Sequence, residues 1–170
     1  NQIYMGHFAL TDVEGNRFFF SERFSRENIE LAGSKTKPFR VWLENWEVTG
    51  DSTKDHFPQI IRAKTEEVEL ELELTSLKPF ILQGNQGHSQ KGSRPGNASF
   101  YYSFTRMKTQ GVLKIQGTPF QVQGHSWMDR EWSTSALEKG QIGWDWFALQ
   151  LSDGREIMLY QIRLENGKPD

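Results

Sequence analysis

Two short stretches of this chain hold most of the side chains that could do chemistry. They cover residues 124–134 and 143–149 and contain four of the six tryptophans, together with or beside the acidic residues Asp129, Glu131, Glu138 and Asp145. Tryptophan rings line apolar sites and lie over cations. A carboxyl group among such rings is either paired or desolvated, and desolvation favours the protonated form that acid catalysts need. The two stretches therefore indicate either an acid catalyst beside an apolar ligand or a well-packed β-core with charged rims.

Asp145 is the first candidate for such an acid. In the strand expected over 144–151, alternation places Asp145 on one face with Phe147, while Trp144 and Trp146 share the opposite face. If the Asp145 face lines a barrel, the carboxyl group finds a cation or hydrogen-bond donors there, or it stays protonated. A protonated acid in an apolar cavity could protonate a substrate. The alternative is a structural Asp that accepts backbone N–H groups at a strand end.

His125 and Trp127 also share a face of their segment. A histidine beside a tryptophan could orient Asp145 or relay its proton. A lone histidine near a strand end is, however, more often a polar residue satisfied by its neighbours. Residues 129–131, Asp-Arg-Glu, form a second acidic cluster, in which Arg130 favours local ion pairing.

The composition limits the classes of function. The chain has 170 residues, a net charge of −2 and no basic tail, which argues against nucleic acid as a partner. No apolar run reaches the length of a transmembrane segment. Cysteine is absent, which excludes disulfides, thiolate nucleophiles and cysteine-bound metals. The four histidines are far apart and no phosphate-binding motif is present, so we expect neither metal nor cofactor.

Alternating apolar residues and closely spaced turns predict an all-β chain. Residues 67–74 show the pattern best, because Val68 and three leucines share one face and four glutamates share the other, which we expect to face water. The expected strands are 2–11, 17–22, 39–48, 67–74, 100–105, 111–116, 119–123, 144–151 and 155–164. Many short strands with turns between them predict a sandwich or a barrel.

Three further features stand out along the chain. Residues 25–31 are predicted to form a short helix with Ser25 as its N-cap. The loop 84–99 contains four glycines and one proline, and it is either a lid over a barrel mouth or a mobile surface loop. Residue 1 is Asn, and the last strand is followed by the hairpin signal Asn166-Gly167, so we expect a segment of a longer protein.

Several of these motifs resemble those of the AttH-like family, also called the carotenoid 1,2-hydratase (CrtC) family, whose members are often labelled predicted secreted hydrolases. The motifs are IYMGHFALTD at 3–12, ERFSR at 22–26, LQG at 82–84, KG at 91–92, PGNAS at 95–99, SWMDREWST at 126–134 and GWDWF at 143–147. The resemblance runs nearly end to end. It implies two lipocalin-like β-barrel domains, of which this chain would be the first or most of it. The family's opening Glu-Trp-Trp segment and its second barrel are absent from this sequence, in agreement with the expectation that it is a segment of a longer protein.

The hydratase branch of this family adds water across an isolated alkene of an acyclic carotenoid without a cofactor. An acid protonates the double bond, a tertiary carbocation forms, and water captures it. That branch uses a His-x-Trp pair and a downstream Asp, and the resemblance maps them onto His125, Trp127 and Asp145. The hydratase pattern also has a tyrosine two residues before the Asp, where this chain has Gly143.

The combined prediction is an all-β, lipocalin-like antiparallel barrel that holds an apolar or amphipathic small molecule, of isoprenoid or lipid type. As an enzyme it would hydrate or isomerise a double bond, with Asp145 as the acid and His125 as its partner. The predicted ligand-binding residues are Trp127, Trp132, Trp144, Trp146 and Phe147.

Two alternatives stay open beside this prediction. One is a non-catalytic ligand carrier of the cell envelope, linked to attachment or transport. The other is a hydrolase, for which the sequence offers no nucleophile, because residues 124–128 lack the final glycine of the nucleophile elbow. The resemblance further implies a periplasmic, secreted or envelope location and a second barrel domain in the same polypeptide.

Overall fold

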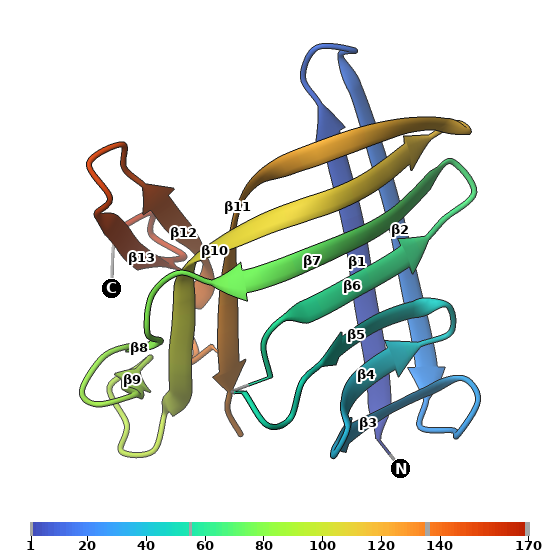
Figure 1. Ribbon diagram of the computed structural model, residues 1–170. Helices are drawn as coiled ribbons and strands as arrows, with labels where there is room; N and C mark the ends of the chain where they lie inside the picture. Colours follow the sequence, from blue (N-terminus) through green and yellow to red (C-terminus); the bar gives the residue numbers. More distant parts are fainter. Residues whose placement is uncertain (1, 55, 135–136, 169–170) are drawn as a thin grey trace. The chain divides into compact units, whose positions relative to one another are not determined.

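The computed structural model describes residues 2–54, 56–134 and 137–168, and within these ranges the chain forms strands and turns without a helix (Figure 1). The all-β prediction is confirmed. The strands are β1 (Ile3–Asp12), β2 (Arg17–Arg26), β3 (Ala32–Thr36), β4 (Phe39–Leu43), β5 (Trp46–Gly50), β6 (Gln59–Lys64), β7 (Val68–Ser76), β8 (Ile81–Leu82), β9 (His88–Gln90), β10 (Ala98–Ile115), β11 (Thr118–Trp132), β12 (Gln141–Gln150) and β13 (Glu156–Leu164).

The strands form three separate sheets. Strands β1 and β2 form one hairpin and β12 and β13 another, while the nine-stranded sheet has the order β11-β10-β7-β6-β5-β4-β3, with β8 and β9 also paired to β10. Across the described residues, none of these sheets closes on itself by strand pairing. The closed barrel that the sequence predicts is therefore not present in the strand pairing, although the all-β architecture is.

The helix predicted for residues 25–31 is wrong. Strand β2 continues to Arg26, and the chain then turns at Asn28. The Asn28 side-chain oxygen accepts the Glu30 amide at 2.9 Å, and its backbone carbonyl accepts the Leu31 amide at 3.1 Å. Asparagine side chains compete in this way with helix formation, because they bond the backbone locally.

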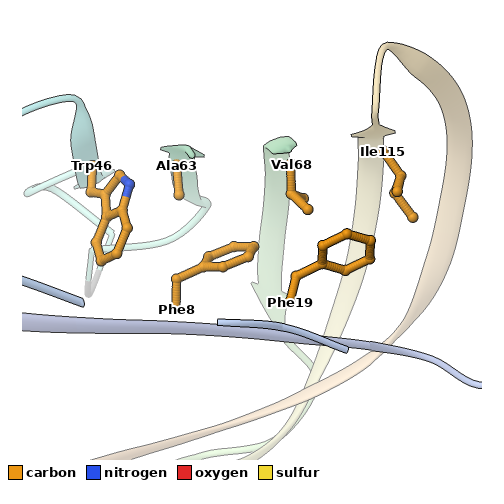
Figure 2. Packing of buried hydrophobic residues seen from close by; sticks show 6 residues of the cluster. All are labelled: Phe8, Phe19, Trp46, Ala63, Val68 and Ile115. Carbon is orange, nitrogen blue, oxygen red and sulfur yellow. The ribbon is translucent and has the colours of Figure 1, made fainter. Parts of the chain in front are cut away.

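The chain divides into two compact units, which we describe one at a time. Unit 1 comprises Asn1–Thr75 and Lys108–Gly124. Its core lies between the β1–β2 hairpin and the sheet. Figure 2 shows Phe8 and Phe19 of the hairpin opposite four apolar side chains of the sheet, namely Trp46, Ala63, Val68 and Ile115. Burial of this apolar surface stabilises unit 1.

The alternation of β7 is confirmed. Val68 and Leu74 are buried, whereas Glu71 is exposed and paired with Arg62 at 2.8 Å. The Glu69 carboxylate accepts a hydrogen bond from the Lys114 ammonium group at 3.2 Å. This bond and one from Lys64 lower the pKa of Glu69. The glutamate row is a solvated, ion-paired face.

Unit 2 comprises Ser76–Met107 and His125–Asp170. Buried ionic contacts join its β12–β13 hairpin to β10. Glu156, at the start of β13, accepts Arg106 at 2.5 Å and Lys78 at 2.6 Å. Burial alone would raise the pKa of Glu156, but these hydrogen bonds outweigh it and lower the pKa. Gln150 adds a hydrogen bond to the Thr105 carbonyl at 2.7 Å.

Gly6 provides a test of the unit 1 core. A Cβ atom at Gly6 would lie 3.0 Å from Leu43 Cδ2 and 3.1 Å from Trp46 Cε3, so β1 can approach the sheet only without a side chain there. We expect Gly6→Ala to lower the free energy of unfolding by about 1 to 3 kcal/mol through overpacking. Gly124→Ala is the matched control, because a Cβ there meets nothing within 4 Å. Urea unfolding measures both, and equal midpoints for the two variants would contradict this account of the core.

Candidate functional site

One face of β10 presents a row of hydroxyl groups inside unit 2. Ser99, Tyr101, Ser103 and Thr105 alternate with Phe100, Tyr102 and Phe104, and the hydroxyl-bearing set is buried, with Ser103 0% and Tyr101 3% exposed. Buried hydroxyl groups are costly unless they are hydrogen-bonded. The row therefore requires polar partners, and β11 and β12 supply them.

Asp129 on β11 is the centre of this polar network. Its Oδ1 accepts the Ser103 hydroxyl at 2.5 Å and the Trp127 indole N–H at 2.9 Å. Both bonds end on the same oxygen. Two donors, one from β10 and one from β11, thus converge on one carboxyl oxygen.

Two further donors hydrogen-bond to the Tyr101 and Ser103 hydroxyl groups. Trp146 of β12 donates its indole N–H to the Tyr101 hydroxyl at 3.3 Å, and the Gln83 amide donates to the Ser103 hydroxyl at 3.0 Å. Burial, with added contributions from Asp129, raises the pKa of Tyr101 to about 12. The phenol therefore keeps its proton at neutral pH.

Lys91 lies against the same tyrosine. Its ammonium group is 5.3 Å from the Tyr101 ring centre and 4.3 Å from that of Tyr160, within cation–π range. It also pairs with Glu131 at 2.7 Å, and Glu131 accepts the buried Ser99 hydroxyl at 2.5 Å. The network thus combines a cation, aromatic rings and two carboxylates.

The structure brings two of the predicted site residues into this network and leaves others outside it. Trp127 and Trp146 bond directly to Asp129 and Tyr101. His125 lies on β11, two residues before Trp127, and is exposed. Asp145 is half exposed and lies 3.5 Å from Arg163, so it is not enclosed by apolar side chains as the sequence suggested. The catalytic roles of His125 and Asp145 stay predictions.

The remaining predicted ligand-binding residues lie on other faces. Trp132 stacks on Phe100 at 5.9 Å and contacts Tyr102, on the face of β10 opposite the hydroxyl row. Trp144 is 59% exposed. Phe147 is half exposed and pairs with Leu159 of β13.

Sequence reasoning missed Tyr101, Ser103 and Lys91 and gave Asp129 a minor place. A signal was present, because residues 99, 101, 103 and 105 carry hydroxyl groups at period two, an unusual composition for one face of a strand. The spacing of Trp127 and Asp129 puts both side chains on one face as well. Nothing in the sequence indicated that these two faces meet.

In the part of the chain that the structure describes, no group of three or more His, Asp or Glu side chains could hold a metal ion. Over the same residues, no helix is long and apolar enough to cross a membrane.

A comparison with protein families decides where this chain belongs. Residues 1–170 match the family described as AttH-like over their whole length. The chain belongs to the AttH-like family. The resemblance found in the sequence motifs is therefore confirmed.

Solved structures show the same fold. An AttH protein from Nitrosomonas europaea is 30% identical, with a TM-score of 0.89, and the match covers 99% of this chain and 52% of that one. Kievitone hydratase from Nectria haematococca is 16% identical, with a TM-score of 0.67, and the match covers 98% of this chain and 54% of that one. The AttH-like chain thus spans about half the length of these structures. No curated protein matches it.

Three groups in the second half of the loop 84–99 bond to one carboxylate, that of Glu138. Glu138 accepts Asn97 Nδ2 at 2.8 Å, the Arg94 amide at 3.2 Å and the Ser93 hydroxyl at 3.1 Å. These hydrogen bonds, that of Asn97 first, lower the Glu138 pKa from its usual 4.5 to about 2. The second half of this loop is therefore fastened to the segment before β12.

The fastening by Glu138 predicts a pH dependence. Because the folded-state pKa lies below the unfolded one, its contribution to stability is complete above about pH 4.5 and is lost as the pH falls toward 2. We expect Glu138→Gln to lower the urea midpoint at pH 7, and the difference from the unmodified protein to shrink below pH 4.5. Glu14→Gln, in the exposed β1–β2 turn, should leave the midpoint unchanged. A Glu138→Gln difference that is the same at pH 7 and pH 3 would contradict the prediction.

Proposed function

We propose that this AttH-like protein binds an apolar or amphipathic small molecule and transfers a proton at one of its carbon–carbon double bonds. The net reaction is hydration or isomerisation without a cofactor. Asp129 is the proton-exchanging group, and Ser103 and Trp127 fix its position. A hydratase is among the solved structures with this fold, which is in keeping with the proposal.

The observation that supports this function most directly is the convergence of donors on Asp129. A carboxylate bonded by Ser103 and Trp127 at 2.5 and 2.9 Å is held in one orientation, as general acid–base catalysis requires. The indole ring of Trp127 borders it, that of Trp146 borders Tyr101, and both offer an apolar surface to a ligand. Such a combination of one fixed carboxylate with aromatic walls suits proton transfer to a hydrocarbon.

Asp145 and His125 form an alternative proton-transferring pair on the same scaffold. The motifs of the hydratase branch favour them, whereas the geometry favours Asp129, because Asp145 is half exposed beside Arg163. Substitution of each aspartate separately distinguishes the two versions.

A non-catalytic carrier is the second candidate function. It is favoured by an aromatic cluster on the opposite face of β10, in which Phe80, Phe100 and Trp132 are exposed and Tyr102 and Phe104 partly buried. Ring contacts of 5.8 to 6.1 Å link the cluster. Exposed apolar surface of this extent usually has a binding role. A carrier would bind ligand without turnover.

A lipocalin-like barrel is also proposed for unit 1, since its β1–β2 hairpin covers the sheet of that unit from one side as a barrel wall would. A second barrel domain in the same polypeptide and a location in the cell envelope belong to the same proposal. The second domain agrees with solved structures about twice as long as this chain.

The proposal predicts the behaviour of three aspartate variants. Citral is a suitable probe, because this small apolar isoprenoid carries two kinds of double bond. We expect Asp129→Asn to lower the uptake of deuterium from D2O into citral by about 100-fold or more, the usual worth of a positioned acid or base. Asp153→Asn, which removes an exposed carboxylate paired with Arg155, should leave the uptake unchanged. Mass spectrometry of recovered citral and its products measures the uptake.

Each other outcome selects a different function. A loss in Asp145→Asn with full activity in Asp129→Asn would move the acid to Asp145. Citral binding without uptake in the unmodified protein would support the carrier. Near-ultraviolet circular dichroism confirms that the variants keep the native packing of their aromatic side chains.

A further inference from the structure

The outer face of the β1–β2 hairpin is apolar and exposed. Phe8 and Phe19 point toward the sheet of unit 1, so the residues that alternate with them on both strands point away from it (Figure 2). Five of these outward side chains are large and apolar and are 57 to 69% exposed, namely Ile3, Met5, Phe18, Phe20 and Phe24. The core of unit 1 accounts for the inner face of the hairpin and leaves this second apolar face without a role.

The outer face is large enough for a specific interface. A phenylalanine side chain presents on the order of 200 Å², so five such side chains at these exposures present roughly 600 Å². This area lies at the upper end of the largest apolar patch on an ordinary monomer, about 300 to 600 Å². If a second copy covered it with the same face, about 1,200 Å² would be buried in total, the lower end of specific protein interfaces.

A polar pair lies at the centre of the same face. The two strands form ten Cα pairs, of which every second one points outward, and the third of these five outward pairs is His7 with Glu22. The His7 Nε2 and Glu22 Oε2 atoms are 3.7 Å apart. A hydrocarbon surface over this face would desolvate both groups and supply no partner for either. The occupant therefore has to offer a carboxylate opposite the histidine and a donor opposite the carboxylate.

A second copy of the chain supplies both groups. When two hairpins pack face to face about a two-fold axis parallel to their strands, β1 of one lies over β2 of the other at the same height. Each residue then faces the counterpart of its own cross-strand partner, so His7 faces Glu22 of the second copy and Glu22 faces His7. The small Ala9 faces the large Phe20, and Met5 faces Phe24, a thioether against a ring.

Other face-to-face arrangements are less favourable. A two-fold axis perpendicular to the strands sets His7 against His7 and Glu22 against Glu22, and like charges opposed across an interface cost several kcal/mol. Packed sheets also cross at about 30° because each is twisted. This crossing separates the outermost pairs of the two hairpins and leaves the central pair in place.

We propose that the outer face of the β1–β2 hairpin is the interface of a homodimer. Two copies pack hairpin against hairpin about an axis parallel to the strands, and His7 of each copy pairs with Glu22 of the other. The proposal goes beyond the reaction proposed above and uses none of the residues around Asp129, so either can fail without the other.

The oligomeric state tests the interface. Sedimentation velocity of the 170-residue chain between about 1 and 200 µM should show a monomer that becomes a dimer, since an interface of this size gives affinities as low as micromolar. Phe20→Glu, which places a carboxylate against Ala9, should abolish the dimer. Ile29→Glu is the matched control, because Ile29 is 84% exposed in the turn after β2 and lies outside the face. A monomer at every concentration, or a dimer that survives Phe20→Glu, would overturn the proposal.

Two complementary variants test which residues face each other. His7→Glu opposes two pairs of carboxylates across the axis, and Glu22→Lys removes both carboxylates from the pairs, so we expect each variant alone to dimerise at least about 10-fold more weakly. In a mixture of the two, the introduced carboxylate faces the introduced ammonium group, and the other pair is the native one. The heterodimer should therefore form with about the affinity of the unmodified dimer. Native mass spectrometry detects it when one variant is labelled with 15N, and failure of the mixture to dimerise would overturn the arrangement.

A further measurement separates a second copy from a small apolar ligand on the same face. Binding of the dye ANS to a monomer, lost in Phe20→Glu and kept in Ile29→Glu, would assign the face to such a ligand and overturn the homodimer. Competition, in which ANS binding falls as the dimer forms, supports the homodimer. Near-ultraviolet circular dichroism at about 1 µM, where the chain is monomeric by this proposal, checks that each variant keeps the native packing of its aromatic side chains.

Discussion

The constraint on which unit 2 depends is that an indole N–H can only donate. Two tryptophans from different strands, Trp127 of β11 and Trp146 of β12, place such donors at the two ends of a short chain of polar groups. Tyr101 accepts from Trp146, and Asp129 accepts from Trp127 and Ser103. Buried polar groups are stable only when they are satisfied, so these N–H donors contribute to the stability of the unit. The same hydrogen bonds orient the carboxyl group for which we propose a chemical role.

The network also requires the β12–β13 hairpin to stay against β10. The hairpin has only two strands, and such a hairpin alone is marginally stable in water. Its attachment is largely polar. Glu156 accepts Lys78 and Arg106, and Gln150 bonds the Thr105 carbonyl. Buried ion pairs contribute more to a defined geometry than to net stability. In this case that geometry brings Trp146 within 3.3 Å of Tyr101.

The parts of the structure that follow from local pattern were predictable from the sequence, and those that depend on which faces meet were not. Period-two alternation in 67–74 places Val68 inside and the glutamates outside, because water and core impose opposite demands on the two faces. The β12–β13 turn at residues 152–154 is equally local. By contrast, 39–48 is two strands joined at Glu44, which has a positive φ of 55°, and Asn45 is the only residue of the turn that favours it by type. The Asp129 network joins residues from 83 to 146, and no spacing rule reaches across such separations.

Asp145 and Trp146 are neighbours on β12, and Trp146 is the one that bonds Tyr101 of β10. Successive side chains of a strand point to opposite faces, so only one of the two can face β10. The register of β12 and β13 is regular from Gly143 onward and shifts only between Gln141 and Gly143, which fixes Trp146 opposite Tyr160 and Asp145 opposite Gln161. Tyr160 faces the site, since its hydroxyl lies 3.2 Å from the buried Ser89 hydroxyl. Trp146 therefore shares the face of Tyr160, and Asp145 shares the outer face with Phe147. A one-residue register shift would exchange them, so the placement of the shift before Gly143 selects which of the two β12 residues, Trp146 or Asp145, faces β10.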